Sequence, residues 1–122
     1  MNTKSWCSYV RKKYGKTLHI YDPVFRQNYY VFIGSPDAFV LEMDKKDISV
    51  EKPDGDGAFT SVEHRGYVTG IIFSIDKNRS LIHECLHAAM WGLTRHGISV
   101  TENYGEILAY YQSFLYKCVT KK

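Results

Sequence analysis

Apolar residues recur every three or four positions in the second half of the chain, which is the spacing that gives a helix one buried face. Between residues 79 and 96 this stripe consists of Leu81, Ile82, Cys85, Leu86, Ala89, Met90 and Leu93. Arg95 and His96 then precede Gly97, and a glycine after a basic last turn is typical of a helix end. The pattern predicts a helix over residues 79–96.

A second helix is predicted after a short connection at residues 97–100. Thr101 is a suitable N-terminal capping residue, and an apolar stripe follows it to about Cys118. The stripe consists of Ile107, Leu108, Tyr111, Phe114, Leu115 and Cys118. Because the connection is short, we expect the two helices to pack side by side and antiparallel.

The first half of the chain carries shorter runs that alternate or are rich in β-branched and aromatic residues, which predicts strands. The runs lie at residues 18–21, 29–33, 58–64 and 67–75. We expect the first two to pair as an antiparallel hairpin and the last two to form a second hairpin. Together they make a sheet of about four strands.

Two further segments connect or precede these strands. Ser35 followed by Pro36 predicts a short helix over residues 37–46 that buries Phe39 and Val40 in the core, with Met43 as a further candidate. The Pro, Asp and Gly residues between positions 51 and 57 predict a loop. Residues 4–14 have loose helical spacing, which suits either a short amphipathic turn or an ordered arm.

These elements predict a single α+β domain over residues 1–122, with a small, mostly antiparallel sheet packed against the helix at 79–96 and a C-terminal helix antiparallel beside it. An apolar fraction of 44% excludes a disordered chain, and a net charge of +3, spread along the sequence, does not indicate a nucleic-acid partner. Three cysteines without metal or redox spacing fit a reducing compartment. No stretch has the length of apolar residues that a signal peptide or membrane span requires, so we expect a cytoplasmic protein.

The predicted helix contains the motif His83-Glu84-Cys85-Leu86-His87, an H-E-x-x-H sequence. Residues four apart project from the same helix face, so both imidazoles can bind one metal ion while Glu84 stands beside it. Zn²⁺ held by two histidines needs one more protein ligand and a water, and Glu84 can take a proton from that water as a general base. Cys85 should point away from the metal into the core. The alternative is an ordinary core helix whose histidines bind no metal.

The predicted C-terminal helix offers candidates for the third ligand. Glu102, Glu106, Tyr110 and Ser113 share a face distinct from the apolar stripe. Glu102 falls in the first turn, whereas Glu106 lies deeper, where packing can hold its rotamer. We therefore predict Glu106 as the third zinc ligand, with Glu102 as the alternative.

These residues resemble the gluzincin metallopeptidases, in which H-E-x-x-H is followed by a glutamate ligand in an E-x-x-A motif. His83-Glu84-Cys85-Leu86-His87 matches the first half, and Glu106-Ile107-Leu108-Ala109 matches the second. The chain looks still more like small phage- and prophage-encoded proteins with H-E-C-x-H-A and E-x-x-A-Y motifs. The resemblance covers residues 80–112 and implies His83, His87 and Glu106 as zinc ligands. The chain departs from thermolysin-like enzymes in being much shorter, without a second lobe to wall a cleft.

The motifs indicate a zinc-dependent hydrolase that cleaves amide bonds in a peptide or protein. Tyr110 is a candidate helper whose hydroxyl would hydrogen-bond a ligand or the developing oxyanion, and a packing role is the alternative. A substrate peptide would add as a strand to a sheet edge, and the more polar segment 58–64 is the expected edge, beside an apolar central segment 67–75. The alternative function is a non-catalytic phage-type protein that binds a host protein through Tyr29, Tyr30 and Trp91.

Overall fold

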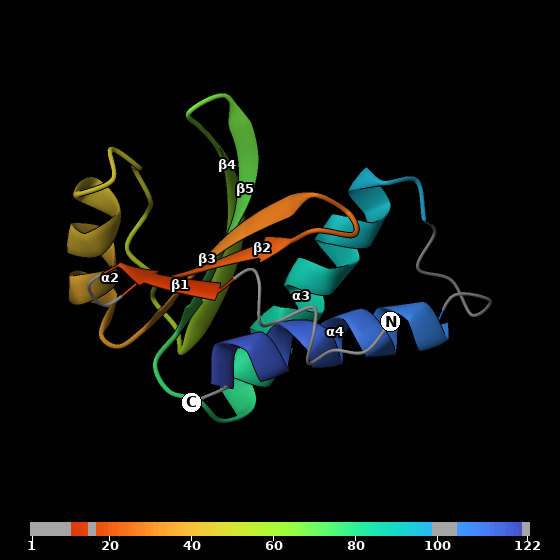
Figure 1. The fold of residues 1–122 in the computed structure, drawn as a ribbon. Coiled ribbons are helices and arrows are strands. Elements are labelled where there is room, and N and C mark those ends of the chain that lie inside the picture. The colour runs from red at the N-terminus through yellow and green to blue at the C-terminus, as the bar shows by residue number, and fades with distance from the viewer. Residues whose placement is uncertain (1–10, 15–16, 99–104, 121–122) are drawn as a thin grey trace.

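The protein is a five-stranded sheet with helices on both faces (Figure 1). The computed structural model describes residues 11–14, 17–98 and 105–120, and the elements below are those of the described residues. The strands are β1 (Arg11–Tyr14), β2 (Thr17–Asp22), β3 (Gln27–Ile33), β4 (Gly57–His64) and β5 (Tyr67–Ser74). The helices are α2 (Pro36–Asp44), α3 (Arg79–Arg95) and α4 (Gly105–Thr120). The α+β class is as predicted.

The strands lie in the order β1-β2-β3-β5-β4. The neighbours are antiparallel except for β3 and β5, which run parallel, with Asn28 opposite Thr69 and Ile33 opposite Ser74. The sheet is therefore mixed, although mostly antiparallel, and both predicted hairpins form. The parallel pair arises because the chain leaves β3, passes through α2 and enters the sheet again at its far edge.

The first strand was not predicted. Residues 11–14, expected to be part of an amphipathic turn or arm, pair instead with residues 17–20 of β2. Their sequence, Arg-Lys-Lys-Tyr, has no alternation of apolar and polar residues, and basic residues are typical of an edge strand. Residues 4–10, the rest of that prediction, lie outside the described part of the chain.

The position of the last hairpin agrees with the prediction. β4 is an edge strand, and its partner among the described residues is β5. β5 lies between β3 and β4, and its residues from Thr69 to Ser74 are all buried. A strand that is buried on both faces has no polar alternation, which is why an uninterrupted apolar run identifies β5 as central.

Two hydrophobic cores lie on opposite faces of the sheet. The larger core joins the sheet to α3 and α4 and contains Tyr29, Val31 and Ile72. The smaller core joins it to α2 and contains Phe32, Ile71 and Phe73. Neighbouring residues of one strand enter different cores because side chains alternate between the two faces of a sheet.

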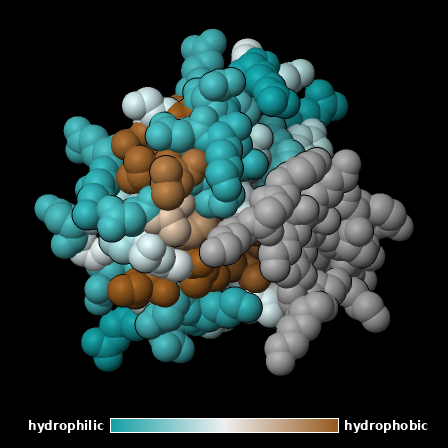
Figure 2. Space-filling model, turned by 90° about the vertical axis from the view of Figure 1, so that its left-hand side faces the viewer, coloured by the Kyte–Doolittle hydropathy of each residue, from teal (hydrophilic) through white to brown (hydrophobic). Residues whose placement is uncertain are grey.

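Helix α2 closes the smaller core and begins as predicted. The Ser35 hydroxyl accepts a hydrogen bond from the backbone N–H of Ala38 at 3.1 Å, and Pro36 occupies the first turn, where its missing N–H is not needed. Phe39 and Met43 are buried, whereas Leu41 is 61% exposed. Figure 2 views this side of the molecule and shows hydrophobic side chains among hydrophilic ones at the surface.

Helices α3 and α4 pack antiparallel, as predicted. The Gln112 amide donates to the carbonyl of Ile82 at 3.1 Å, and the Tyr116 hydroxyl donates to the carbonyl of Lys77 at the same distance. The residue further along α4, Tyr116, contacts the residue that comes earlier in the chain, Lys77, as antiparallel packing requires. Thr101, the predicted cap, lies outside the described residues. None of the helices in the described ranges is long and apolar enough to cross a membrane.

The buried face of α3 differs from the predicted stripe. The buried residues are Leu81, Glu84, Cys85, Ala88, Ala89, Gly92 and Leu93. Ile82 and Met90, expected in the core, are 46% and 36% exposed. The small residues Ala88 and Gly92 lie between α3 and its neighbours, so the helix is rotated away from the predicted stripe.

Gly92 allows a chain of buried hydroxyl groups to pass beneath α3. A Cβ atom at this position would collide with the Tyr29 hydroxyl and lie 3.0 Å from the Tyr111 ring. The Tyr29 and Tyr111 hydroxyls are 2.8 Å apart, and Tyr111 donates to the Asp22 carboxylate at 2.6 Å. These contacts join β2, β3 and α4. Burial raises the pKa of both tyrosines, and in Tyr111 the neighbouring Tyr29 and Asp22 raise it further.

We expect Tyr111→Phe to reduce stability by roughly 1–3 kcal/mol because the buried Asp22 carboxylate loses a donor. The wild type should also lose stability above pH 10 more steeply than the variant. The raised pKa keeps Tyr111 protonated in the folded state, whereas the same residue ionises from about pH 10 in the unfolded chain. The free energy of unfolding of the wild type should therefore fall by about 1.4 kcal/mol more per pH unit than that of the variant. Urea unfolding between pH 7 and 11 measures both effects. Tyr110→Phe is the control, since Tyr110 is 74% exposed; equal slopes in all three proteins would contradict the prediction.

Candidate metal centre

The two histidines of the H-E-x-x-H motif meet on the exposed face of α3. Their Nε2 atoms are 3.0 Å apart, and their rings are inclined at 81°. Two nitrogens bound to one Zn²⁺ at about 2.0–2.1 Å in tetrahedral geometry stand about 3.3 Å apart. His83 and His87 therefore already have nearly the separation that a shared metal ion requires, and both rings are accessible to solvent.

Glu84 lies on the adjacent face of the helix and is buried, with 7% of its surface exposed. A Cβ atom added to Gly57 would lie 2.8 Å from the Glu84 Cγ and Oε2 atoms, so the carboxyl group rests against the start of β4. Among the described residues no hydrogen bond or ion pair to this carboxylate is found. The Glu84 oxygens are not among the fully buried side-chain atoms that lack a partner, so water can still reach the carboxylate.

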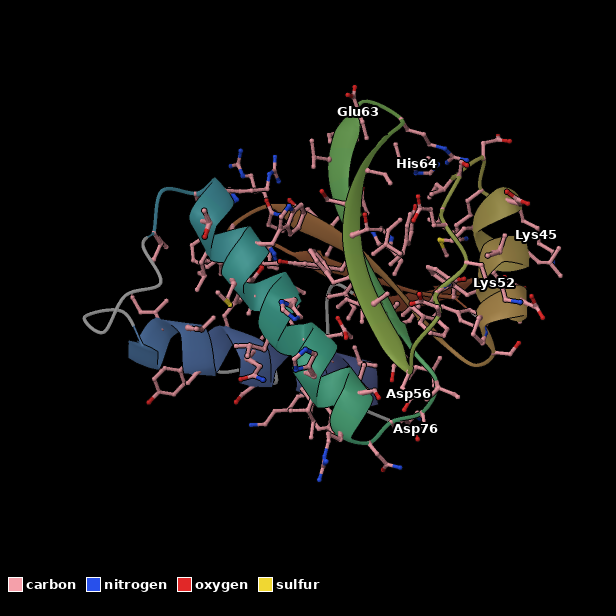
Figure 3. The ribbon with its side chains drawn as sticks, turned by 180° about the vertical axis from the view of Figure 1, so that it is seen from behind. Lys45, Lys52, Asp56, Glu63, His64 and Asp76 are labelled. Carbon is pink, nitrogen blue, oxygen red and sulfur yellow. The ribbon has the colours of Figure 1, made fainter. Side chains whose placement is uncertain are left out.

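The same face of α3 continues along β4. The Trp91 ring packs on Phe59, with ring centroids 5.5 Å apart, and a Cβ atom at Gly70 would lie 2.9 Å from the Trp91 ring. Figure 3 shows α3 running beside the β4–β5 hairpin. Since Glu84 contacts Gly57 and Trp91 contacts Phe59, the motif helix lies along the first half of the edge strand. The helix that carries the histidine pair therefore packs over the edge strand β4 and its neighbour β5.

The third predicted ligand lies at the margin of the described residues. The backbone of Glu106 is in the first turn of α4, but its side chain, like the whole of Glu102, lies outside the described part. Within the described part, no group of three or more His, Cys, Asp or Glu side chains could hold a metal ion. The structure brings the two predicted histidine ligands together and places Glu84 on the neighbouring helix face against Gly57, and the third ligand stays a prediction. Tyr110, the predicted helper, is 74% exposed.

Cys85 lies in the core, away from the histidine pair, as expected. It is fully buried and unpaired, and burial together with the nearby Glu84 carboxylate raises the pKa of its thiol to about 12. A thiol with this pKa remains protonated at neutral pH and is a poor metal ligand or nucleophile. Cys118 is also buried, and Cys7 lies outside the described residues.

Burial tests the expectation that Tyr29, Tyr30 and Trp91 are exposed contact residues. Tyr29, expected among exposed aromatic contacts, is wholly buried because its hydroxyl bonds to Tyr111 in the core, while Tyr30 and Trp91 are half-buried. His96 follows the last residue of α3. Its Nε2 atom lies 2.8 Å from the side-chain oxygen of Gln27. That contact ties the end of α3 to β3.

No protein-family model, no curated protein and no solved structure matches this chain. The resemblance to gluzincins therefore rests on the two short motifs alone. The features of the structure that bear on function are the positions of His83, Glu84 and His87 and the strand beside their helix.

Gly57 contacts the Glu84 side chain, although its sequence context predicts only the end of a loop. We expect Gly57→Ala to cost about 1–3 kcal/mol of stability, because the new methyl group overlaps the Glu84 side chain and forces α3 and β4 apart. Gly55→Ala is the matched control, since a Cβ atom there meets nothing within 4 Å. Urea unfolding of both variants provides the measurement, and a Gly57→Ala protein as stable as the control would refute the contact.

Proposed function

We propose that this protein is a zinc-dependent hydrolase, most closely comparable to gluzincin metallopeptidases, that cleaves amide bonds. The observation that carries the proposal is the pair of exposed Nε2 atoms 3.0 Å apart beside a buried carboxylate without a donor among the described residues. A purely structural histidine pair would have no need of such a carboxylate. A structural zinc site would also have its four positions filled by protein ligands.

The donor set of the proposed site fits Zn²⁺. His83 and His87 supply two imidazole nitrogens, and Glu106, or else Glu102, supplies a carboxylate from the following helix. Three protein ligands leave one position for water, as catalytic zinc sites do. Bound there, zinc would act as a Lewis acid that polarises the substrate carbonyl and lowers the pKa of water to about 7.

Glu84 would perform the proton transfers. Its carboxylate accepts a proton from the attacking water and delivers it to the leaving nitrogen of the amide. The walls around it, Gly57 and the core beneath α3, hold the side chain in place and limit its contact with bulk water. Tyr110 on α4 is a proposed donor to the developing oxyanion.

The substrate we propose is an extended peptide that pairs with β4. This strand is at the edge of the sheet, and its first residues lie under the motif helix. Main-chain hydrogen bonds at a sheet edge hold many sequences in one register, with the side chains giving selectivity. A host protein of a phage would be one source of such a peptide, and cytoplasm would be the place of action.

A second candidate function is host-protein binding without catalysis. The exposed side chains of Ile82 and Met90 favour it, because they provide apolar surface next to the histidine pair. Tyr30 and Trp91 are half-buried and could contribute only their exposed edges. Capture of partners with wild type and Glu84→Gln separates the two functions, since a binding protein retains the same intact partner with both, whereas an enzyme releases a cleaved product only with wild type.

We expect purified wild-type protein to bind one zinc ion, and His83→Ala and His87→Ala to lose most of it, because each removes one of the two imidazole ligands. Metal analysis after dialysis against zinc measures the content. His96→Ala is the matched control, since its ring contacts Gln27 and Phe25 and not the pair. Full zinc content in both motif variants would refute the site.

We expect Glu84→Gln to keep its zinc and to lose peptide cleavage by a factor of about 10²–10⁴, because the amide cannot accept the proton. Cleavage of a mixed peptide library, followed by mass spectrometry, measures the activity. Unchanged cleavage by this variant would exclude Glu84 as the base.

Glu106→Gln and Glu102→Gln distinguish the two candidates for the third ligand. We expect Glu106→Gln to weaken zinc binding by about tenfold or more, because the neutral amide is a poorer ligand than the carboxylate, and Glu102→Gln to leave it unchanged. Competition with a chelating dye measures the affinities. The reverse order would identify Glu102 as the ligand.

A further inference from the structure

The face of the sheet opposite α3 carries a groove of about 530 Å³ beside β4. One wall is β4 itself, and the other is the segment from Ser49 to Asp54, which leads from α2 back to the sheet. Figure 3 shows this segment descending from Lys45 past Lys52 to Asp56 alongside the hairpin. The groove is lined by Phe39, Val50, Pro53, Ala58, Val62 and Ile71, with Glu51, Lys52 and Asp54 among the remaining lining residues.

The groove and the histidine pair lie on opposite sides of one strand. Ala58 and Val62 pack against the smaller core on the α2 side, and Thr60 between them also lines the groove. Phe59, the intervening residue, packs against Trp91 of α3. Since side chains alternate along a strand, β4 separates a face that carries the candidate metal site from a face that carries the groove.

A peptide that pairs with the free edge of β4 would have the same alternation. Successive residues of an extended strand point to opposite faces, and residues two apart are about 6.6–6.8 Å apart. One set of side chains would lie on the side of α3, and the other would lie over the groove. The groove has the volume of a small-ligand pocket and could hold two such side chains.

We propose that this groove selects apolar side chains at alternate positions of an extended peptide that pairs with β4. The inference rests on the proposed function, because it assigns a specificity to the same substrate strand. Phe39, Val50 and Ile71 are among the apolar residues that line the groove, and Glu51 and Asp54 are among its polar ones. An acidic side chain placed there would lose hydration beside carboxylates of like charge. Lys52 is already paired with Asp37 at 2.9 Å, and both side chains are largely exposed.

Thr60 is one of the β4 residues that line the groove. Thr60 is exposed, although its neighbours two positions away, Ala58 and Val62, are partly buried. A larger side chain at Thr60 would extend into the groove without displacing the core. Thr60→Trp is therefore a filling variant, and Thr60→Val, which keeps the shape and size of threonine, is its matched control.

The test measures peptide binding in the zinc-loaded Glu84→Gln protein, so that cleavage does not interfere. The probes are two fluorescein-labelled octapeptides, one alternating leucine with threonine and one alternating aspartate with threonine. Fluorescence anisotropy should show at least tenfold tighter binding of the leucine peptide. Adding Thr60→Trp should weaken that binding at least tenfold, and adding Thr60→Val should not change it.

Two results would overturn the inference: equal affinity for both peptides, including absence of binding, or unchanged affinity for the leucine peptide in Thr60→Trp. Cleavage assays with wild type and Thr60→Trp separate this failure from failure of the proposed function. Cleavage that does not depend on Thr60 would leave the hydrolase in place and remove the groove from it. Groove-dependent binding without any cleavage by wild type would keep the groove and reject the hydrolase.

Discussion

The hydrogen bond from Tyr111 to the buried Asp22 carboxylate is the contact on which the arrangement of the helices depends. Asp22 is at the end of β2 and is fully buried, so its charge must be matched within the fold. Tyr111 reaches it from α4 and also meets the Tyr29 hydroxyl from β3. These three groups hold α4 to the sheet. Because Gly92 has no side chain, α3 can pack directly over the two tyrosines.

The candidate metal centre follows from that packing. Ala88, Ala89 and Gly92 let α3 approach the sheet and α4 closely, and the approach buries Glu84 against Gly57. The neighbouring face of α3, which carries His83 and His87, is then the one exposed to solvent. A buried acid on the same helix as two accessible imidazoles therefore depends on small residues that follow the motif, at positions 88, 89 and 92.

Periodicity was sufficient to predict most elements but not their detailed contacts. The spacing of apolar residues located α3, and the uninterrupted apolar run located β5. Residues 11–14 could not be predicted as a strand, because main-chain pairing with β2 forms them and their side chains carry no pattern. The exposure of Ile82 could not be predicted either. The spacing of apolar residues shows which residues share a helix face, but not which side of a wide apolar face packs against another element. The motif placed His83, Glu84 and His87 together, whereas the third ligand depends on a side chain outside the described residues.

The two edges of the sheet differ in charge. The β1 edge carries consecutive basic residues from Arg11 to Lys13, whereas β4 is uncharged from Gly57 to Val62. Charge repels a second strand, and an uncharged edge accepts one without regard to its origin. The β4 edge of another copy of the chain is also an uncharged strand that can pair there. Solubility at high concentration and access for an extended ligand are thus opposing demands on the same eight residues of β4.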